Sequence, residues 1–177
     1  TAFSINDIFS IKENMVSLVK LSQKAENQFI GVNCGIMDQF AIGMGAVNKA
    51  IFLNCASLNY ELVPLVLKGY KLIISNTNKR RGLTDSKYNE RRSECDTAVE
   101  NLSQIKKIKN LSELSYARFL EINDMITSPI VRRRAKHVIS ENQRVLDAVN
   151  ALKGGDLKLF GQLMNASHDS LRDDYEV

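Results

Sequence analysis

The chain contains no tryptophan, two prolines, two histidines and three cysteines among its 177 residues. The odd number of cysteines (Cys34, Cys55 and Cys95) argues against a disulfide framework, and their spacing is not that of metal ligands. A reducing compartment is therefore expected, and the cytoplasm is the predicted location. No apolar run approaches the roughly 20 residues that cross a bilayer, so the sequence predicts no membrane partner.

The overall composition is ordinary for a globular protein. Hydrophobic residues make up 44% of the chain and charged residues 25%, and the length is sufficient for a substantial core. The net charge of +4 is modest. Basic clusters occur at residues 79–81 and 132–134, but no aromatic-rich recognition motif accompanies them, so no nucleic-acid partner is predicted. The second cluster is interpreted as a solvated helix face.

The first part of the chain mixes helical and strand patterns. Apolar residues recur at steps of three or four and predict an amphipathic helix over residues 4–23. Short β-rich segments at residues 50–53 and 60–66 predict a hairpin, and residues 70–75 predict a buried strand.

After this strand the pattern is almost entirely helical. Ser128 followed by Pro129 predicts the start of a long helix, and the glycine pair at residues 154–155 predicts its end. Asp156 is the predicted cap of the last helix. The pattern changes from strands to helices near Lys68, and a lobe boundary is predicted there. With both kinds of element, the predicted fold class is α+β.

Residues 31–40 carry the most informative motif, Gly-Val-Asn-Cys-Gly-Ile-Met-Asp-Gln-Phe. The glycines predict a tight turn, and the apolar residues around Asp38 predict that a helix begins there. The first turn of a helix offers unpaired N–H groups and a positive dipole end, which favour anionic groups. The spacing alone also fits an ordinary glycine turn with an acidic residue in the first helical turn.

This motif, with Ala-Glu-Asn at residues 25–27 before it, resembles the segment of galactokinases that carries their active-site aspartate. Galactokinases share a family, the GHMP kinases, with homoserine, mevalonate and phosphomevalonate kinases. Stretches within residues 76–95, 134–145 and 164–177 resemble the same proteins in the same order. The resemblance implies a two-lobed GHMP-kinase-type fold of which this chain is the central part (helix, hairpin and strand, then mostly helices). Residues 1–68 would belong to the N-lobe and residues 69–177 to the C-lobe.

Three galactokinase motifs do not occur in the sequence. They are the N-terminal sugar-gripping motif, whose arginine lies beside the aspartate, the phosphate loop, and the C-terminal glycine motif. We therefore expect a piece cut from the middle of a galactokinase and inactive by itself. Without that arginine, the aspartate lacks a partner that would keep it ionised.

The resemblance implies transfer of the ATP γ-phosphate to the C1 hydroxyl of galactose. Asp38 would accept the hydroxyl proton or orient the hydroxyl, since a carboxylate within hydrogen-bond reach can do either. Glu26 matches a glutamate that helps bind the nucleotide's Mg²⁺, an ion that needs few protein carboxylates beside phosphate oxygens and waters. The alternative for Glu26 is a surface glutamate near a helix end.

Two further positions have weaker assignments. Tyr88 matches a tyrosine that contacts the sugar, and its alternative is a half-buried tyrosine on a helix face. Arg80 and Arg81 are candidates for phosphate contacts, because guanidinium groups suit oxyanions, and their alternative is a pair of solvated loop arginines. His137 and His168 are interpreted as structural, hydrogen-bonding histidines.

The predicted function is thus that of an ATP-dependent sugar kinase using Mg²⁺, with galactose as its small-molecule partner and a monomeric parent protein. An N-acetylgalactosamine kinase is the alternative within the kinases. A non-catalytic regulator that senses galactose and ATP is the alternative from another class. Asp38 favours the enzyme, because a sensor needs no proton acceptor.

Overall fold

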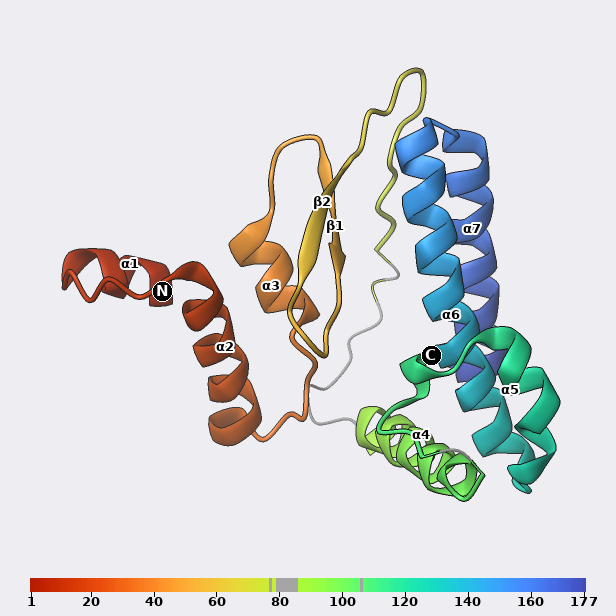
Figure 1. The fold of residues 1–177 in the computed structure, drawn as a ribbon. Coiled ribbons are helices and arrows are strands. Elements are labelled where there is room, and N and C mark those ends of the chain that lie inside the picture. Colours follow the sequence, from red (N-terminus) through yellow and green to blue (C-terminus); the bar gives the residue numbers. More distant parts are fainter. Residues whose placement is uncertain (77, 79–85, 106) are drawn as a thin grey trace. The chain divides into compact units, whose positions relative to one another are not determined.

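The computed structural model describes residues 1–76, 78, 86–105 and 107–177, and for residues 86–88 it describes the backbone only. The chain divides into two compact units, Thr1–Thr84 and Asp85–Val177 (Figure 1). The first unit combines helices with a small sheet, whereas the described elements of the second are all helical. The predicted α+β class is confirmed.

The first unit begins with two helices, α1 (Ala2–Ile8) and α2 (Met15–Ala25), so the single helix predicted over residues 4–23 is wrong. Ser10 and Lys12 lie between them with φ angles of 50° and 65°, a left-handed conformation that a right-handed helix cannot continue. Asn14 then caps α2, where its side-chain oxygen accepts a hydrogen bond from Ser17 N at 2.9 Å. The apolar spacing runs through this break and therefore conceals it.

Helix α2 continues into a π-helical turn, Glu26–Ile30, and Gly31 ends this turn with a φ of 83°. A short loop leads to α3 (Met37–Met44), which begins where the sequence predicts. Helices α2 and α3 pack together through a small core that contains Val19, Ile36 and Phe40.

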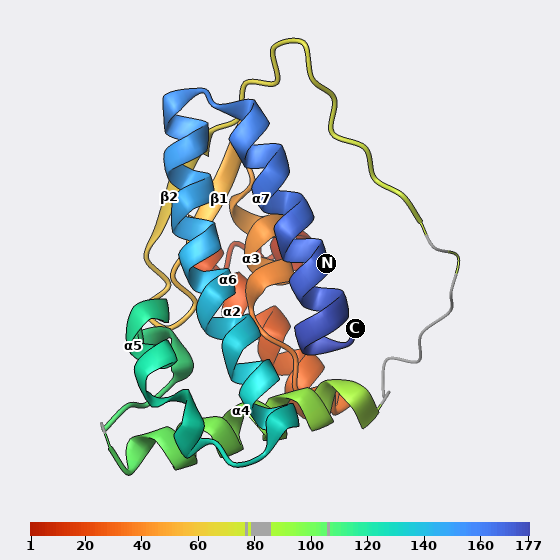
Figure 2. The same cartoon turned by 90° about the vertical axis from the view of Figure 1, so that its right-hand side faces the viewer.

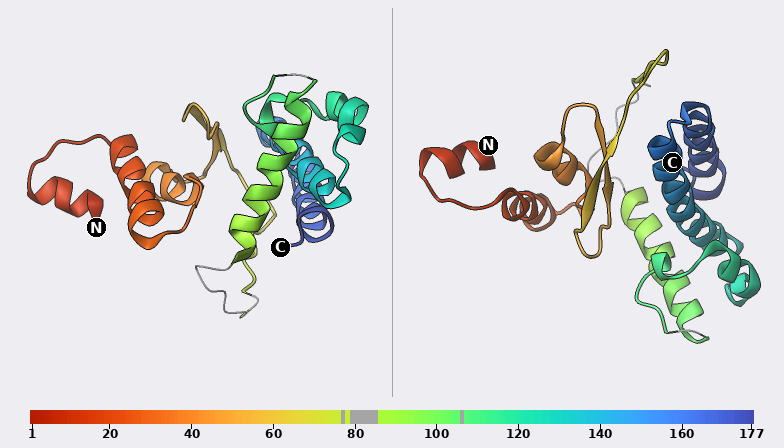
Figure 3. Two further views of the ribbon diagram at one scale, coloured as in Figure 1. Left: turned by 90° about the horizontal axis from the view of Figure 1, so that it is seen from below. Right: turned by 45° about the horizontal axis from the view of Figure 1, so that its top comes forward.

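The predicted hairpin is confirmed as β1 (Lys49–Leu53) and β2 (Tyr60–Pro64), which pair in antiparallel register. Helix α3 lies beside this hairpin in the views of Figure 3. The ring of Phe40 meets that of Tyr60 edge-on, with centroids 5.2 Å apart. The helix that carries Asp38 is therefore held between α2 and the sheet.

The buried strand predicted at residues 70–75 is wrong. These residues form no strand, and Ile73 and Ile74 are 80% and 89% exposed. A strand needs a hydrogen-bonding neighbour, and the sheet found among the described residues consists of β1 and β2 alone. The β-rich composition indicates a local preference for extended backbone, but it does not show whether a neighbouring strand is present.

The second unit is helical. Figure 2 shows α6 and α7 side by side, with α4 and α5 near the end of α6 that lies away from its connection to α7. The helices are α4 (Ser86–Ser103), α5 (Tyr116–Ile122), α6 (Pro129–Gly154) and α7 (Leu157–Ser170), with shorter turns at Leu111–Glu113, Asn123–Met125 and Leu171–Tyr175.

The predicted ends of α6 and α7 are confirmed. Ser128 Oγ accepts a hydrogen bond from Val131 N at 3.4 Å before the proline at the start of α6, and Gly155 ends that helix with a φ of 72°. Asp156 caps α7 through a bond from Leu159 N at 2.9 Å. The main core of the unit is apolar and comes from α4, α5, the first half of α6 and the intervening turns: Ala98, Leu102, Ile108, Leu111, Leu114, Phe119, Ile122, Ile126, Val131, Ala135 and Ile139.

Candidate functional site

Asp38 is the second residue of α3, and it is exposed. The residue that precedes the helix, Ile36, has no side chain that can accept a hydrogen bond from the first turn. The leading N–H groups of α3 are therefore not capped by that residue, and the helix dipole adds positive potential at the same end. The local structure suits an acidic side chain and negatively charged ligand groups, as the sequence motif predicts.

Glu26 is the first residue of the π-helical turn and is also exposed. Its backbone carbonyl accepts hydrogen bonds from Gly31 N at 3.0 Å and Val32 N at 3.3 Å. The loop that leads to α3 is thereby folded back onto Glu26, and the positive φ of Gly31 permits this reversal.

Cys34 connects this loop to the Glu26 turn. Its Sγ lies 3.2 Å from Glu26 Oε2 and 3.2 Å from Asn27 Oδ1, and its backbone N–H donates to Asn27 Oδ1 at 3.1 Å. Gln23 Nε2 donates to the Cys34 carbonyl at 3.2 Å, and Gln39 Nε2 donates to Sγ at 3.8 Å. Burial and the hydrogen bond to Glu26 raise the pKa of the Cys34 thiol, so the thiol keeps its proton at neutral pH.

The sequence pattern does not predict this role of Cys34, because the number and spacing of the cysteines bear only on disulfides and metal sites. The available signal was its position between two glycines and four residues before Asp38. The structure brings Glu26 and Cys34 into direct contact. In the described part of the chain, the side chain of Asp38 takes no part in this hydrogen-bonded cluster.

Three predicted site residues lie wholly or partly outside the described residues. Arg80 and Arg81 lie outside the described residues. Tyr88 is in the first turn of α4, but its side chain also lies outside the described part. Their assignments stay predictions.

In the second unit, Arg134 is only 1% exposed, so the interpretation of residues 132–134 as a solvated face is wrong for this side chain. Its Nε donates to Glu94 Oε2 at 2.8 Å, Nη1 to the Asp174 carbonyl at 2.7 Å and Nη2 to Glu176 Oε2 at 2.7 Å. Burial alone would lower the pKa of Arg134, but these two glutamates raise it above its usual value.

Arg91 supports the same arrangement from α4. It is 3% exposed, and it donates to the Tyr175 carbonyl at 2.7 Å and to Glu94 Oε2 at 3.0 Å. The two arginines thus hold residues 174–176 against α4 and α6, through the carbonyls of Asp174 and Tyr175 and the carboxylate of Glu176. This gives the C-terminal Arg-Asp-Asp-Tyr-Glu sequence a structural role.

His137 is buried beside this segment. Its Nδ1 lies 3.0 Å from Ser170 Oγ, which donates to Asp174 Oδ2 at 3.2 Å, and its ring centroid is 4.6 Å from that of Tyr175. Burial lowers the pKa of His137, so the imidazole is neutral near pH 7. These contacts agree with the predicted structural role.

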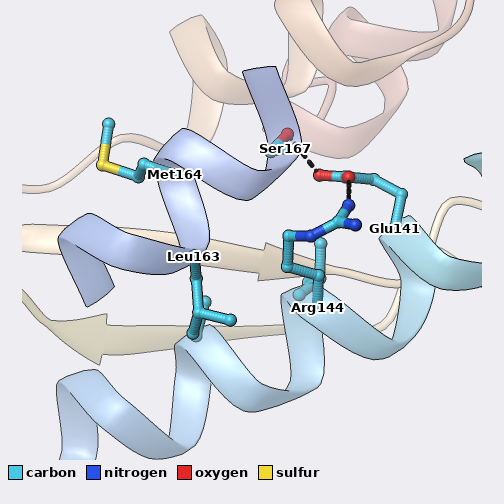
Figure 4. Close-up of a pocket in the computed structure, with 7 residues that line it drawn as sticks. Glu141, Arg144, Leu163, Met164 and Ser167 are labelled. Carbon is cyan, nitrogen blue, oxygen red and sulfur yellow. Dashed lines mark hydrogen bonds and ion pairs between the residues drawn. The ribbon is translucent and has the colours of Figure 1, made fainter. Parts of the chain in front are cut away.

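A pocket of about 220 Å³ lies between α6 and α7 (Figure 4). Figure 4 shows Glu141 between Arg144 and Ser167, and Ser167 Oγ donates to Glu141 Oε1 at 2.7 Å. The remaining lining is apolar, with Leu163 and Met164 on α7. Its polar groups are paired with one another, and none of the predicted site residues lines it, so it offers no support for a catalytic role.

Among the described residues, no three or more His, Cys, Asp or Glu side chains are grouped so that they could hold a metal ion by themselves. A Mg²⁺ ion held largely by phosphate oxygens and waters needs no such group, and the exposed carboxylate of Glu26 fits that requirement. None of the helices in the described part of the chain has both the length and the apolar character to cross a membrane.

Comparison with known proteins gives matches to the GHMP kinases and to galactokinases. The model of the GHMP kinases N terminal domain matches residues 1–46. The galactokinase of Clostridium acetobutylicum is 57% identical over 177 residues, which are 100% of this chain and 46% of that protein. The galactokinase of Clostridium beijerinckii is 58% identical over 173 residues, or 98% of this chain and 44% of that protein.

A solved structure gives the same result for the fold. The crystal structure of Lactococcus lactis galactokinase complexed with galactose matches with a TM-score of 0.95 and 47% identity, covering 99% of this chain and 45% of that one. The chain thus spans just under half the length of the relatives it matches, and the predicted GHMP-kinase-type fold is confirmed. Over nearly its whole length the chain is similar in sequence and in fold to galactokinases, and its residues 1–46 match the GHMP kinases N terminal domain.

Proposed function

We propose that residues 1–177 form the central part of an ATP-dependent galactokinase, with residues 1–68 in one lobe and residues 69–177 in the other. The observation that carries this proposal is the 57% identity to a galactokinase over all 177 residues. The whole protein would transfer the γ-phosphate of ATP to the C1 hydroxyl of galactose. We expect it to be a cytoplasmic monomer.

Asp38 is the proposed proton acceptor or hydroxyl-orienting group. Its position in the first turn of α3 leaves the carboxylate exposed, and α2 and the β1–β2 hairpin fix the helix that carries it. Phosphoryl transfer depends mainly on positioning and on neutralising charge, so a firmly held helix is a suitable platform for this group. The positive end of α3 lies at the same turn as Asp38 and favours negative charge there.

Glu26 is the proposed protein ligand for the Mg²⁺ that accompanies ATP. When bound, this ion neutralises phosphate charge. Tyr88 is proposed to hydrogen-bond a sugar oxygen, and Arg80 and Arg81 are weaker candidates for phosphate contacts.

The test is an assay of the full-length protein that contains these residues. ADP release is measured with galactose, with N-acetylgalactosamine and without sugar, and the phosphorus spectrum of the product locates the phosphate. The proposal expects galactose-dependent ADP release and phosphate on C1, with no turnover by residues 1–177 alone. Preference for N-acetylgalactosamine would identify the other kinase, and binding of sugar and ATP without turnover would identify the regulator.

A further inference from the structure

Cys34 lies in the loop between the two carboxylates of the proposed site. Glu26 is eight residues before it, at the start of the π-helical turn, and Asp38 is four residues after it, in the first turn of α3. Its backbone is fixed on both sides, by Asn27 Oδ1 at its N–H and by Gln23 Nε2 at its carbonyl. The direction of its side chain is therefore set by the loop.

The thiol has one proton and two acceptors at 3.2 Å, Glu26 Oε2 and Asn27 Oδ1. The Asn27 oxygen already accepts the backbone N–H of Cys34, whereas the carboxylate is charged and so is the stronger acceptor. The proton is therefore best donated to Glu26. Gln39 of α3 donates to the sulfur, so the thiol links the glutamate to the helix that carries Asp38.

We propose that Cys34 is a positioning residue, whose thiol holds the Glu26 carboxylate in the orientation that receives the nucleotide-bound divalent cation. This inference rests on the proposed function of Glu26. One carboxylate oxygen accepts a hydrogen bond from the thiol, and the other would be available as a ligand for the cation. Groups that orient a metal ligand in this way commonly contribute tenfold or more to metal affinity.

The first test measures Mn²⁺ affinity by electron paramagnetic resonance in the full-length protein, with a non-hydrolysable ATP analogue bound. Cys34→Ala, which cannot donate, should weaken Mn²⁺ binding by about tenfold, the low end for such groups because a thiol is a weak donor. Cys34→Ser keeps a donor and should remain within about threefold of the wild type. Galactose affinity should not change in either variant, and Cys55→Ala, in an exposed turn, is the matched control.

The second test is the infrared S–H stretching band that disappears in Cys34→Ser. A Glu26→Gln variant replaces the charged acceptor, so this band should move to higher frequency. Wild-type Mn²⁺ affinity in a folded Cys34→Ala protein, or an unmoved band in Glu26→Gln, would overturn the role of Cys34. If Glu26→Gln itself binds Mn²⁺ as tightly as the wild type, the assignment of Glu26 fails instead.

Discussion

At the residue scale, the most consequential side chain outside the proposed site is Arg134. Its guanidinium is buried and satisfied by two carboxylates and one backbone carbonyl. The position of Arg134 in a cluster of arginines on one helix predicts a solvated side chain. Its hydrogen-bond acceptors, however, come from α4 and from residues about 40 positions later in the chain. A sequence pattern on one helix contains no information about such distant partners.

Replacing Arg134 with Met should destabilise the full-length protein by about 3 kcal/mol. This is the lower end for breaking a buried pair, because Arg91 still contacts Glu94 in the variant. Arg92→Met is the control, since Arg92 and its partner Asp96 are both exposed, and it should change stability by less than about 0.5 kcal/mol. Denaturant unfolding measures both, and equal effects of the two substitutions would refute the structural role of Arg134.

At the element scale, the position of α3 depends on its close approach to α2. A Cβ built on Gly43 would lie 2.6 Å from Val19 Cγ2 and 3.3 Å from Met15 Cγ, distances too short to be tolerated without movement. Glycine is therefore required here by packing, since only a residue without a side chain lets the two helices meet.

Gly43→Ala should push α3 away from α2 and reduce stability by about 1–3 kcal/mol, the usual cost of overpacking. Gly161→Ala in α7 is the matched control, because a Cβ there meets nothing within 4 Å and alanine is the better helix former. The control should be neutral or more stable by up to about 1 kcal/mol. Thermal unfolding measures the stability of both variants. A Gly43→Ala protein as stable as the wild type would show that the helices can separate without cost.

The elements that could be predicted from sequence are those whose signals are local. The start of α6 is encoded by Ser128 with the following proline, and its end by Gly155 in a left-handed conformation. The break between α1 and α2 was not predicted because it depends on two left-handed residues within an unbroken apolar pattern. The prediction of a strand at residues 70–75 was wrong. A strand must pair with another strand, and a local sequence pattern does not show whether such a partner is present.

The same distinction holds for the candidate site. The motif around Asp38 correctly predicted a turn followed by a helix, because glycine freedom and helix initiation are local properties. The contact of Cys34 with Glu26 was not predicted, since it depends on how the loop folds back over the π-helical turn. Roles drawn from the galactokinase resemblance remain proposals at each position.

At the scale of the whole molecule, the pH dependence of stability should follow the buried His137. Its pKa is lowered by burial from the ordinary 6.5, so the unfolded chain binds a proton that the folded chain does not. The free energy of unfolding therefore falls as the pH drops below about 6.5. Glu176, whose pKa is lowered by hydrogen bonds from Arg134, acts in a separate window, and its contribution is lost only below about its ordinary 4.5.

His137→Gln should flatten the stability profile between about pH 7 and about pH 5.5. His168→Gln, a change at an exposed histidine, is the matched control. Denaturant unfolding of both variants at several pH values provides the measurement. A His137→Gln profile as steep as that of the wild type would mean that another group titrates in this range.

The central proposal is that Asp38 is the carboxylate that accepts the hydroxyl proton, or orients the hydroxyl, in a galactokinase. The most direct test is galactose-dependent ADP release by the full-length protein and by its Asp38→Asn variant. The variant should keep its fold while turnover falls by about 100-fold or more, the scale of a lost acid–base group. Near-normal turnover in a folded Asp38→Asn protein would contradict the claim.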